Sequence, residues 1–161
     1  RLYLSIMLWF MGRAIQAAAR VDREVRKAFD TIPDGFTFAL TVAPDGPAML
    51  VGKDKAGKVR YLGAYPKARY IDLTLTVKNI EAAILLFTFQ EATVTAVARD
   101  RLIVDGEFPA ACTVVRILDM VEVFLLPKRL ASLAVRRYPQ WPPFRKYVGR
   151  TLIYLRAVVG L

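Results

Sequence analysis

The sequence predicts an α+β fold in which a sheet of five strands is packed on one face by helices. Residues 36–42 alternate between apolar and small or polar side chains, and residues 70–77 alternate in the same way. Such alternation is typical of strands with one buried face. Residues 80–89 are then almost entirely apolar, which predicts a helix with too little polar surface to face water. Strands flanked by helices in this way favour the α+β class.

The remaining elements follow from turn signals and helical periodicity. Asp-Gly at 45–46 and Gly57 separate three strands within residues 36–63, and Asn79 is placed to cap the apolar helix. Residues 91–99 fit a short helix or a strand equally well. The other predicted elements are one long helix at 2–29, a strand at 101–107, and helices at 109–126, 128–137 and 142–159.

The composition excludes several classes of chemistry. The chain has 161 residues, no histidine and one cysteine, so Ser-His-Asp catalysis and most zinc sites are excluded. Cys112 lies in an apolar run and is predicted to be a buried small side chain. Arg116, Asp119 and Glu122 are spaced three apart on one helix and are interpreted as an exposed ladder of ion pairs. The sequence therefore predicts a protein without enzymatic activity, metal or cofactor.

Two short motifs and their order resemble a known family. The strand "DLTLT" at 72–76 precedes the apolar helix, and "LIVDGE" at 102–107 precedes the next one. This arrangement resembles the sterol carrier protein 2-like (SCP2-like) domain over residues 32–125. The resemblance implies a five-stranded mixed sheet with helices on one face and a lipid tunnel between the two layers. It also implies lipid binding or transfer without chemistry, and some bacterial relatives are accessory factors in quinone biosynthesis.

The expected ligand is a fatty acid, a sterol or an isoprenoid-type lipid, and the resemblance divides the chain into three parts. Residues 1–31 form an N-terminal helix, residues 32–126 form the SCP2-like domain, and residues 127–161 form a basic amphipathic tail. The residues expected to line the lipid cavity are Phe38, Leu40, Leu75, Ile84, Phe87, Ile103, Ile117 and Met120. The alternative is a structural or assembly subunit with a filled core that forms a homodimer through its N-terminal helix.

The positive charge is concentrated in the tail. The net charge is +10, and residues 127–161 contain eight basic residues but no acidic residue. These residues are the expected membrane contacts: Lys128, Arg129, Arg136, Arg137, Arg145, Lys146, Arg150 and Arg156. A basic amphipathic helix suits an anionic membrane surface, but the same pattern fits a helix docked on its own domain, or one that binds nucleic acid or an acidic protein. The membrane interpretation predicts a cytoplasmic protein that is peripheral on the inner face of a membrane.

The last predicted helix has a clear apolar face on a helical wheel. Five residues fall on this face: Val148, Leu152, Leu155, Val158 and Val159. Ile153 is the exception, because it falls among the basic residues. If the helix docks on its own domain, the wheel therefore predicts that the basic face is exposed to solvent.

Overall fold

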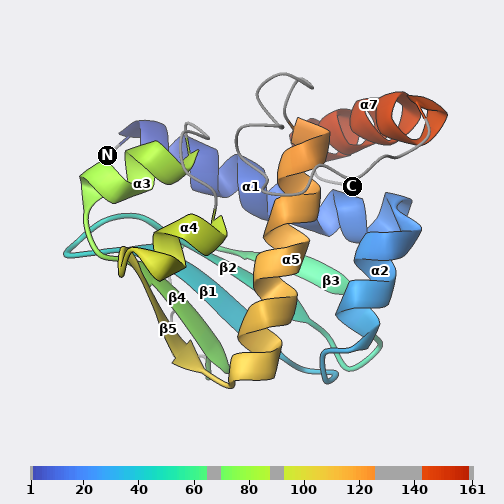
Figure 1. Ribbon diagram of the computed structural model, residues 1–161. Helices are drawn as coiled ribbons and strands as arrows, with labels where there is room; N and C mark the ends of the chain where they lie inside the picture. The colour runs from blue at the N-terminus through green and yellow to red at the C-terminus, as the bar shows by residue number, and fades with distance from the viewer. Residues whose placement is uncertain (1, 65–69, 88–92, 126–142, 160–161) are drawn as a thin grey trace.

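The computed structural model describes residues 2–64, 70–87, 93–125 and 143–159. Its helices are α1 (Leu2–Val21), α2 (Arg23–Asp30), α3 (Ile80–Phe87), α4 (Thr93–Ala98), α5 (Phe108–Leu125) and α7 (Pro143–Val159). Its strands are β1 (Thr37–Val42), β2 (Ala48–Lys53), β3 (Val59–Gly63), β4 (Leu73–Val77) and β5 (Leu102–Gly106). Figure 1 shows the helices and strands in their positions along the chain.

The five strands form one mixed sheet in the order β3-β2-β1-β4-β5, as predicted. β1 and β4 are parallel, and the other neighbouring strands are antiparallel. Asp72, the first residue of the "DLTLT" motif, fixes the start of the parallel pair. Its carboxylate accepts a hydrogen bond from Thr37 N at 2.8 Å, and its own N donates to Thr37 O at 2.9 Å. The Asp72 carboxylate therefore accepts the hydrogen bond from Thr37 N that the backbone of a neighbouring strand would otherwise accept.

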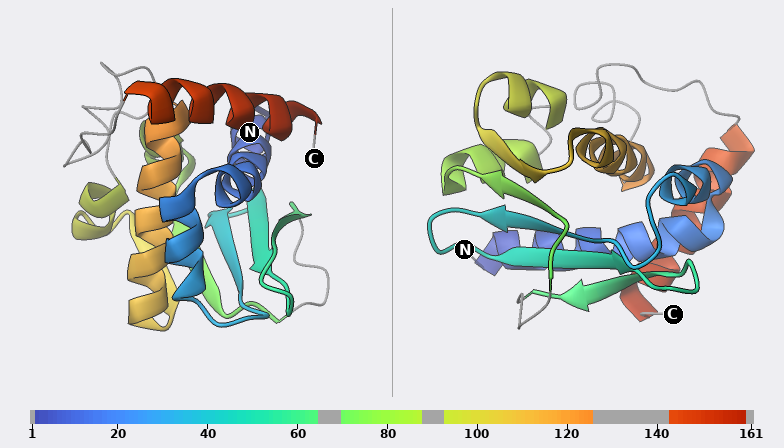
Figure 2. Two further views of the ribbon diagram at one scale, coloured as in Figure 1. Left: turned by 90° about the vertical axis from the view of Figure 1, so that its right-hand side faces the viewer. Right: turned by 90° about the horizontal axis from the view of Figure 1, so that it is seen from below.

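The helices α3, α4 and α5 lie together on one side of the sheet (Figure 2). In a parallel pair, residues opposite each other point to the same face, so Phe38 with Leu73 and Leu40 with Leu75 define one face of the sheet. This face and the inner sides of the six described helices form one hydrophobic core, to which α7 contributes a single residue, Ile153. The α+β class and the one-sided helical layer are thus confirmed.

The predicted single helix at 2–29 is interrupted at Asp22. Asp22 has extended backbone angles (φ −101°, ψ 128°), and its carboxylate accepts hydrogen bonds from Glu24 N at 2.9 Å and Val25 N at 3.0 Å. This is an N-cap, which satisfies the free N–H groups at the start of α2. The uncertain segment 91–99 contains helix α4. The predicted helix at 128–137 lies outside the described residues.

Helix α1 has the length and apolar composition of a membrane-spanning helix, but 50% of its most apolar stretch is buried in the domain. It packs against β2 and β3, and two of its residues fit closely on Tyr61 of β3. Gln16 Oε1 accepts a hydrogen bond from Tyr61 N at 2.7 Å. A Cβ atom on Gly12 would lie 2.4 Å from Tyr61 Cδ2, so the absence of a side chain there lets the aromatic ring lie against the helix.

We expect the substitution Gly12→Ala to destabilise the fold although alanine favours helices. The clash with the Tyr61 ring should cost about 1–3 kcal/mol, more than the ~1 kcal/mol gained in helix propensity. Urea denaturation measures the difference in free energy of unfolding. In a Tyr61→Ala background the same substitution should become stabilising, because the ring is gone. Destabilisation of equal size in both backgrounds would contradict this account of the contact.

Candidate functional site

Most of the predicted cavity residues meet in the interior between the sheet and the helices. Phe38, Leu40, Leu75, Phe87 and Ile117 are all buried and belong to the same core. Met120 of α5 is half-buried against this core. The sheet, α3 and α5 therefore bring six of the eight predicted residues to one apolar region.

The two remaining residues lie elsewhere. Ile103 is opposite Thr76, which points away from the helices, and its side chain is 46% exposed. The prediction is wrong for Ile103 because β5 presents Leu102 and Val104 to the core, on either side of it. Ile84 is 42% exposed on the outer side of α3, whereas Phe87 points inward. Ile84 is thus at the surface beside the apolar region.

Two short helices cover the β4–β5 end of the interior. Asn79 caps α3 as predicted, since its Oδ1 accepts a hydrogen bond from Ala82 N at 2.7 Å. Helices α3 and α4 have 8 and 6 residues, and helices this short depend on packing for their stability. At this end of the interior Ala83 is buried, whereas Val97 is 40% exposed.

Glu122 of α5 is buried, with only 5% of its surface exposed. Burial raises its pKa well above the ordinary glutamate value, and the nearby Asp119 carboxylate raises it further. The predicted exposed ladder of Arg116, Asp119 and Glu122 is therefore wrong, because the helix turns Glu122 inward. Cys112, on the same helix, is exposed and not buried as predicted.

Helix α7 docks on the rest of the molecule through a narrow buried stripe and two side-chain hydrogen bonds. Gly149, Ile153 and Ala157 form its buried stripe, and a Cβ on Gly149 would be 3.0 Å from the Phe124 ring. Arg150 Nε donates to Phe124 O at 2.8 Å, and the Tyr154 hydroxyl donates to Leu125 O. These two bonds tie α7 to carbonyl groups in the last described turn of α5. They also fix α7 across α1 and the end of α5 (Figures 1 and 2).

The apolar face of α7 points outward. Val148 and Leu152 are each 40% exposed, Leu155 is 59% exposed, Val158 is 66% exposed and Val159 is 63% exposed. We call these five residues the outer stripe. Docking occurs through Ile153, the residue that did not fit the predicted apolar face, so the wheel predicted the wrong orientation. The structure thus leaves a whole apolar helix face at the surface, where its contact with water is unfavourable.

The predicted membrane-contact residues have different positions. Arg156 is exposed on α7, whereas Arg150 is half-buried and holds α7 to α5. Arg150 is therefore a structural residue and not part of a free basic face. Arg145 and Lys146 lie in the first turn of α7. Lys128, Arg129, Arg136 and Arg137 lie outside the described residues.

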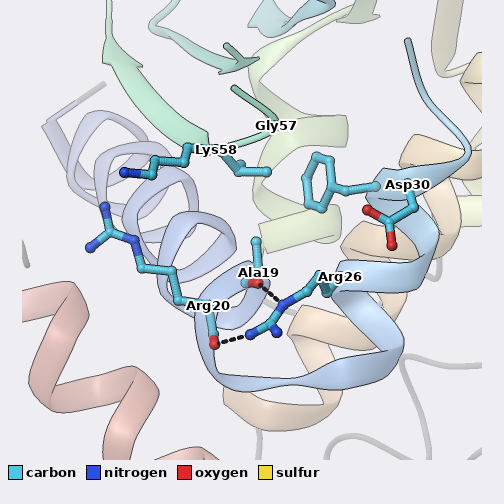
Figure 3. A pocket seen from close by; sticks show the side chains of 8 residues that line it. Ala19, Arg20, Arg26, Asp30, Gly57 and Lys58 are labelled. Carbon is cyan, nitrogen blue, oxygen red and sulfur yellow. Dashed lines mark hydrogen bonds between the residues drawn. The ribbon is translucent and has the colours of Figure 1, made fainter. Parts of the chain in front are cut away.

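Two open hollows share Arg20, and the second of them borders α7. The first has a volume of about 390 Å³ and is formed by α1, α2 and the turn between β2 and β3. The second has a volume of about 400 Å³ and is lined by Arg20, Leu155, Arg156 and Val159. Figure 3 shows the first hollow, in which the ends of Arg20 and Lys58 point to one side and Asp30 lies on the other. Sequence patterns did not indicate this site, because its residues come from three separate elements.

Comparison with known proteins places the fold. No family model matches the chain, and no curated protein matches it. Among solved structures, a conserved hypothetical protein of Thermus thermophilus, whose description suggests a sterol carrier protein, is 16% identical with a TM-score of 0.50. That similarity covers 78% of this chain and 86% of the other.

Two further solved structures are similar at lower scores. The sterol carrier protein domain 2 of Helicoverpa armigera is 17% identical with a TM-score of 0.44, over 86% of this chain and 90% of that domain. A protein described as UbiJ-SCP2, a ubiquinone synthesis protein, is 15% identical with a TM-score of 0.45, over 62% of this chain and 82% of the other. The similarity to the Thermus thermophilus structure shows that the chain has the SCP2-like fold.

Proposed function

We propose that the protein binds or transfers a lipid without catalysing a reaction, and that it docks on anionic membranes through α7. The ligand is a fatty acid, a sterol or an isoprenoid-type lipid, held between the sheet and helices α3, α4 and α5. The SCP2-like fold supports lipid binding in general. The observation that carries the proposal for this chain is the apolar interior between the sheet and these helices, where Phe38, Leu75 and Phe87 belong to one core.

A lipid chain can enter this region if α3 and α4 move apart from α5. Each buried CH₂ group contributes about 0.8 kcal/mol, so an acyl chain of ordinary length stabilises an opened form enough to offset the displacement of two short helices. The lipid loses a similar free energy when it leaves a bilayer. Transfer is therefore nearly balanced, and it is fast only when the protein lies on the membrane surface.

The outer stripe of α7 supports the membrane contact. Its apolar residues face outward, and the tail that contains it has eight basic residues and no acidic residue. Apolar insertion combined with basic charge is the pattern of helices that lie in the interface of anionic membranes. On this proposal the protein is cytoplasmic and peripheral on the inner face of a membrane.

Native mass spectrometry of the purified protein, followed by solvent extraction, tests the lipid-binding proposal. We expect a bound lipid, or saturable uptake of a fluorescent fatty acid or sterol analogue by the delipidated protein. The variant Ala83→Trp fills the region beneath α3 and should reduce uptake at least tenfold. Phe108→Trp, at an exposed position of α5, is the matched control and should bind like the native protein. Absence of both extracted lipid and uptake would refute the proposal.

A structural or assembly subunit is the second candidate, and one observation favours it. The first turns of α1 expose four large apolar residues: Leu2, Tyr3, Ile6 and Trp9. A second copy of the chain could cover them, which would make a homodimer with a filled core. Light scattering decides this point, since a dimer that persists at micromolar concentration and dissociates on Ile6→Asp would favour the second candidate.

A further inference from the structure

Two cationic side chains line the hollow of Figure 3, and their ends point to the side away from Asp30. Arg20 comes from the last turn of α1, and Lys58 comes from the turn that joins β2 to β3. Neither forms an ion pair with the residues that the structure describes. Like charges held close together repel each other, so an anion bound between them would be stabilised.

The third cation of this hollow has a structural role. The Arg26 guanidinium donates to Ala19 O and Arg20 O, the last carbonyl groups of α1. It therefore neutralises the negative end of the α1 dipole, which would otherwise repel an anion. Asp30 lies across the hollow from Lys58 (Figure 3) and leaves the cationic side open.

One of these cations, Arg20, also borders the outer stripe of α7. Arg20 also lines the second hollow, together with Arg156 and with Leu155 and Val159 of the outer stripe. Apolar residues that suit a membrane thus lie directly beside basic residues that suit an anion. A molecule with an apolar tail and an anionic head would contact both kinds of residue at once.

We propose that Arg20, Lys58 and Arg156 form a binding site for a phosphate group, supplied by a phospholipid headgroup when α7 lies on a membrane. The proposal rests on the proposed function, because it names the chemistry that α7 meets at the membrane surface. Arginine binds two phosphate oxygens at once through its planar guanidinium, and lysine adds a point charge. A carboxylate offers less charge and fewer oxygens, so the site should prefer phosphate.

Binding to vesicles of equal charge tests the site. One set contains phosphatidylglycerol in phosphatidylcholine, and the other contains oleate in phosphatidylcholine, which presents carboxylate. The native protein should bind the phosphatidylglycerol vesicles more tightly. Arg20→Gln with Lys58→Gln should weaken that binding about tenfold and remove the preference. Lys27→Gln with Arg116→Gln, which removes the same charge outside both hollows, should change binding less than twofold.

Soluble glycerol phosphate separates the two sources of phosphate. Glycerol phosphate at millimolar concentration should displace the native protein from vesicles but should not displace the Arg20→Gln, Lys58→Gln variant, and this result supports the phosphate site. If the protein binds glycerol phosphate but shows no preference between the two sets of vesicles, the site belongs to a soluble phosphate ligand. Equal weakening by both pairs of substitutions, or no preference and no competition, would overturn the site. Uptake of a fluorescent fatty acid without vesicles is measured in parallel, so a failure of lipid binding is seen separately from a failure of this site.

Discussion

Replacing two residues of the outer stripe with aspartate should abolish membrane binding while leaving the fold intact. Leu152 and Leu155 are 40% and 59% exposed, so their substitution removes little buried surface from the folded protein. At a membrane each leucine would transfer its exposed apolar area into the interface, which contributes roughly 1–1.5 kcal/mol. Loss of both gives about a hundredfold weaker binding, and the new negative charges add repulsion from an anionic surface.

Flotation with phosphatidylglycerol-containing vesicles measures the effect of Leu152→Asp with Leu155→Asp. The control is Phe108→Asp with Cys112→Asp, which introduces the same charge at two exposed positions of α5. The control should float like the native protein, and both variants should unfold near the native midpoint in urea. If the α7 variant floats as well as the control, the outer stripe does not contact membranes. A partner protein or nucleic acid would then be the occupant of this face.

Replacing Glu122 with glutamine should stabilise the protein, and the gain should grow with pH. Burial and the Asp119 carboxylate raise the pKa of Glu122 in the folded state above its value in the unfolded chain. Between these two pKa values the folded state keeps a proton that the unfolded state has lost. The free energy of unfolding therefore falls as the pH rises through this window, starting at about pH 4.3, the ordinary glutamate pKa.

Glutamine carries no charge, so Glu122→Gln removes this dependence. We expect little difference from the native protein at pH 4 and a gain of about 1–3 kcal/mol at pH 8. Urea denaturation across this pH range measures it. Glu107→Gln, at an exposed position before α5, controls for the loss of one negative charge and should change stability by about 0.5 kcal/mol or less. A gain that is equal at pH 4 and pH 8 would show that ionisation of Glu122 is not the cause.

The sheet was predictable from the sequence because β1 and β4 alternate between larger apolar residues and small or polar ones. The alternation at 36–42 and 70–77 places Phe38, Leu40 and Leu75 on one face, and the structure agrees. Residues 102–104 are apolar at every position, so alternation gives no face there, and Ile103 was assigned to the wrong one. The pairing of β5 with β4 decides which residues of β5 face the core, and the sequence of β5 alone does not reveal that pairing.

The helices show where periodicity fails. An apolar face predicts burial only when the rest of the protein offers a surface to cover it, and α7 is held instead by Gly149 and by two hydrogen bonds to the end of α5. The spacing of Gly149, Ile153 and Ala157 was a usable signal, since residues four apart lie on one helix face and the two small ones, eight apart, permit close packing there. The break at Asp22 also had a local signal, because aspartate followed by Glu24 favours a helix start. The burial of Glu122 had no signal within its own helix.

The position of a bound lipid tests the central claim most directly. Stearate that carries a nitroxide spin label on its chain broadens the NMR signals of nearby amide groups. We predict that the delipidated protein, titrated with this probe, loses amide signals in β4, β5, α3, α4 and the facing part of α5, while signals in the β2–β3 turn persist. Broadening confined to α7, or no broadening at saturating probe, would contradict a lipid site between the sheet and its helices.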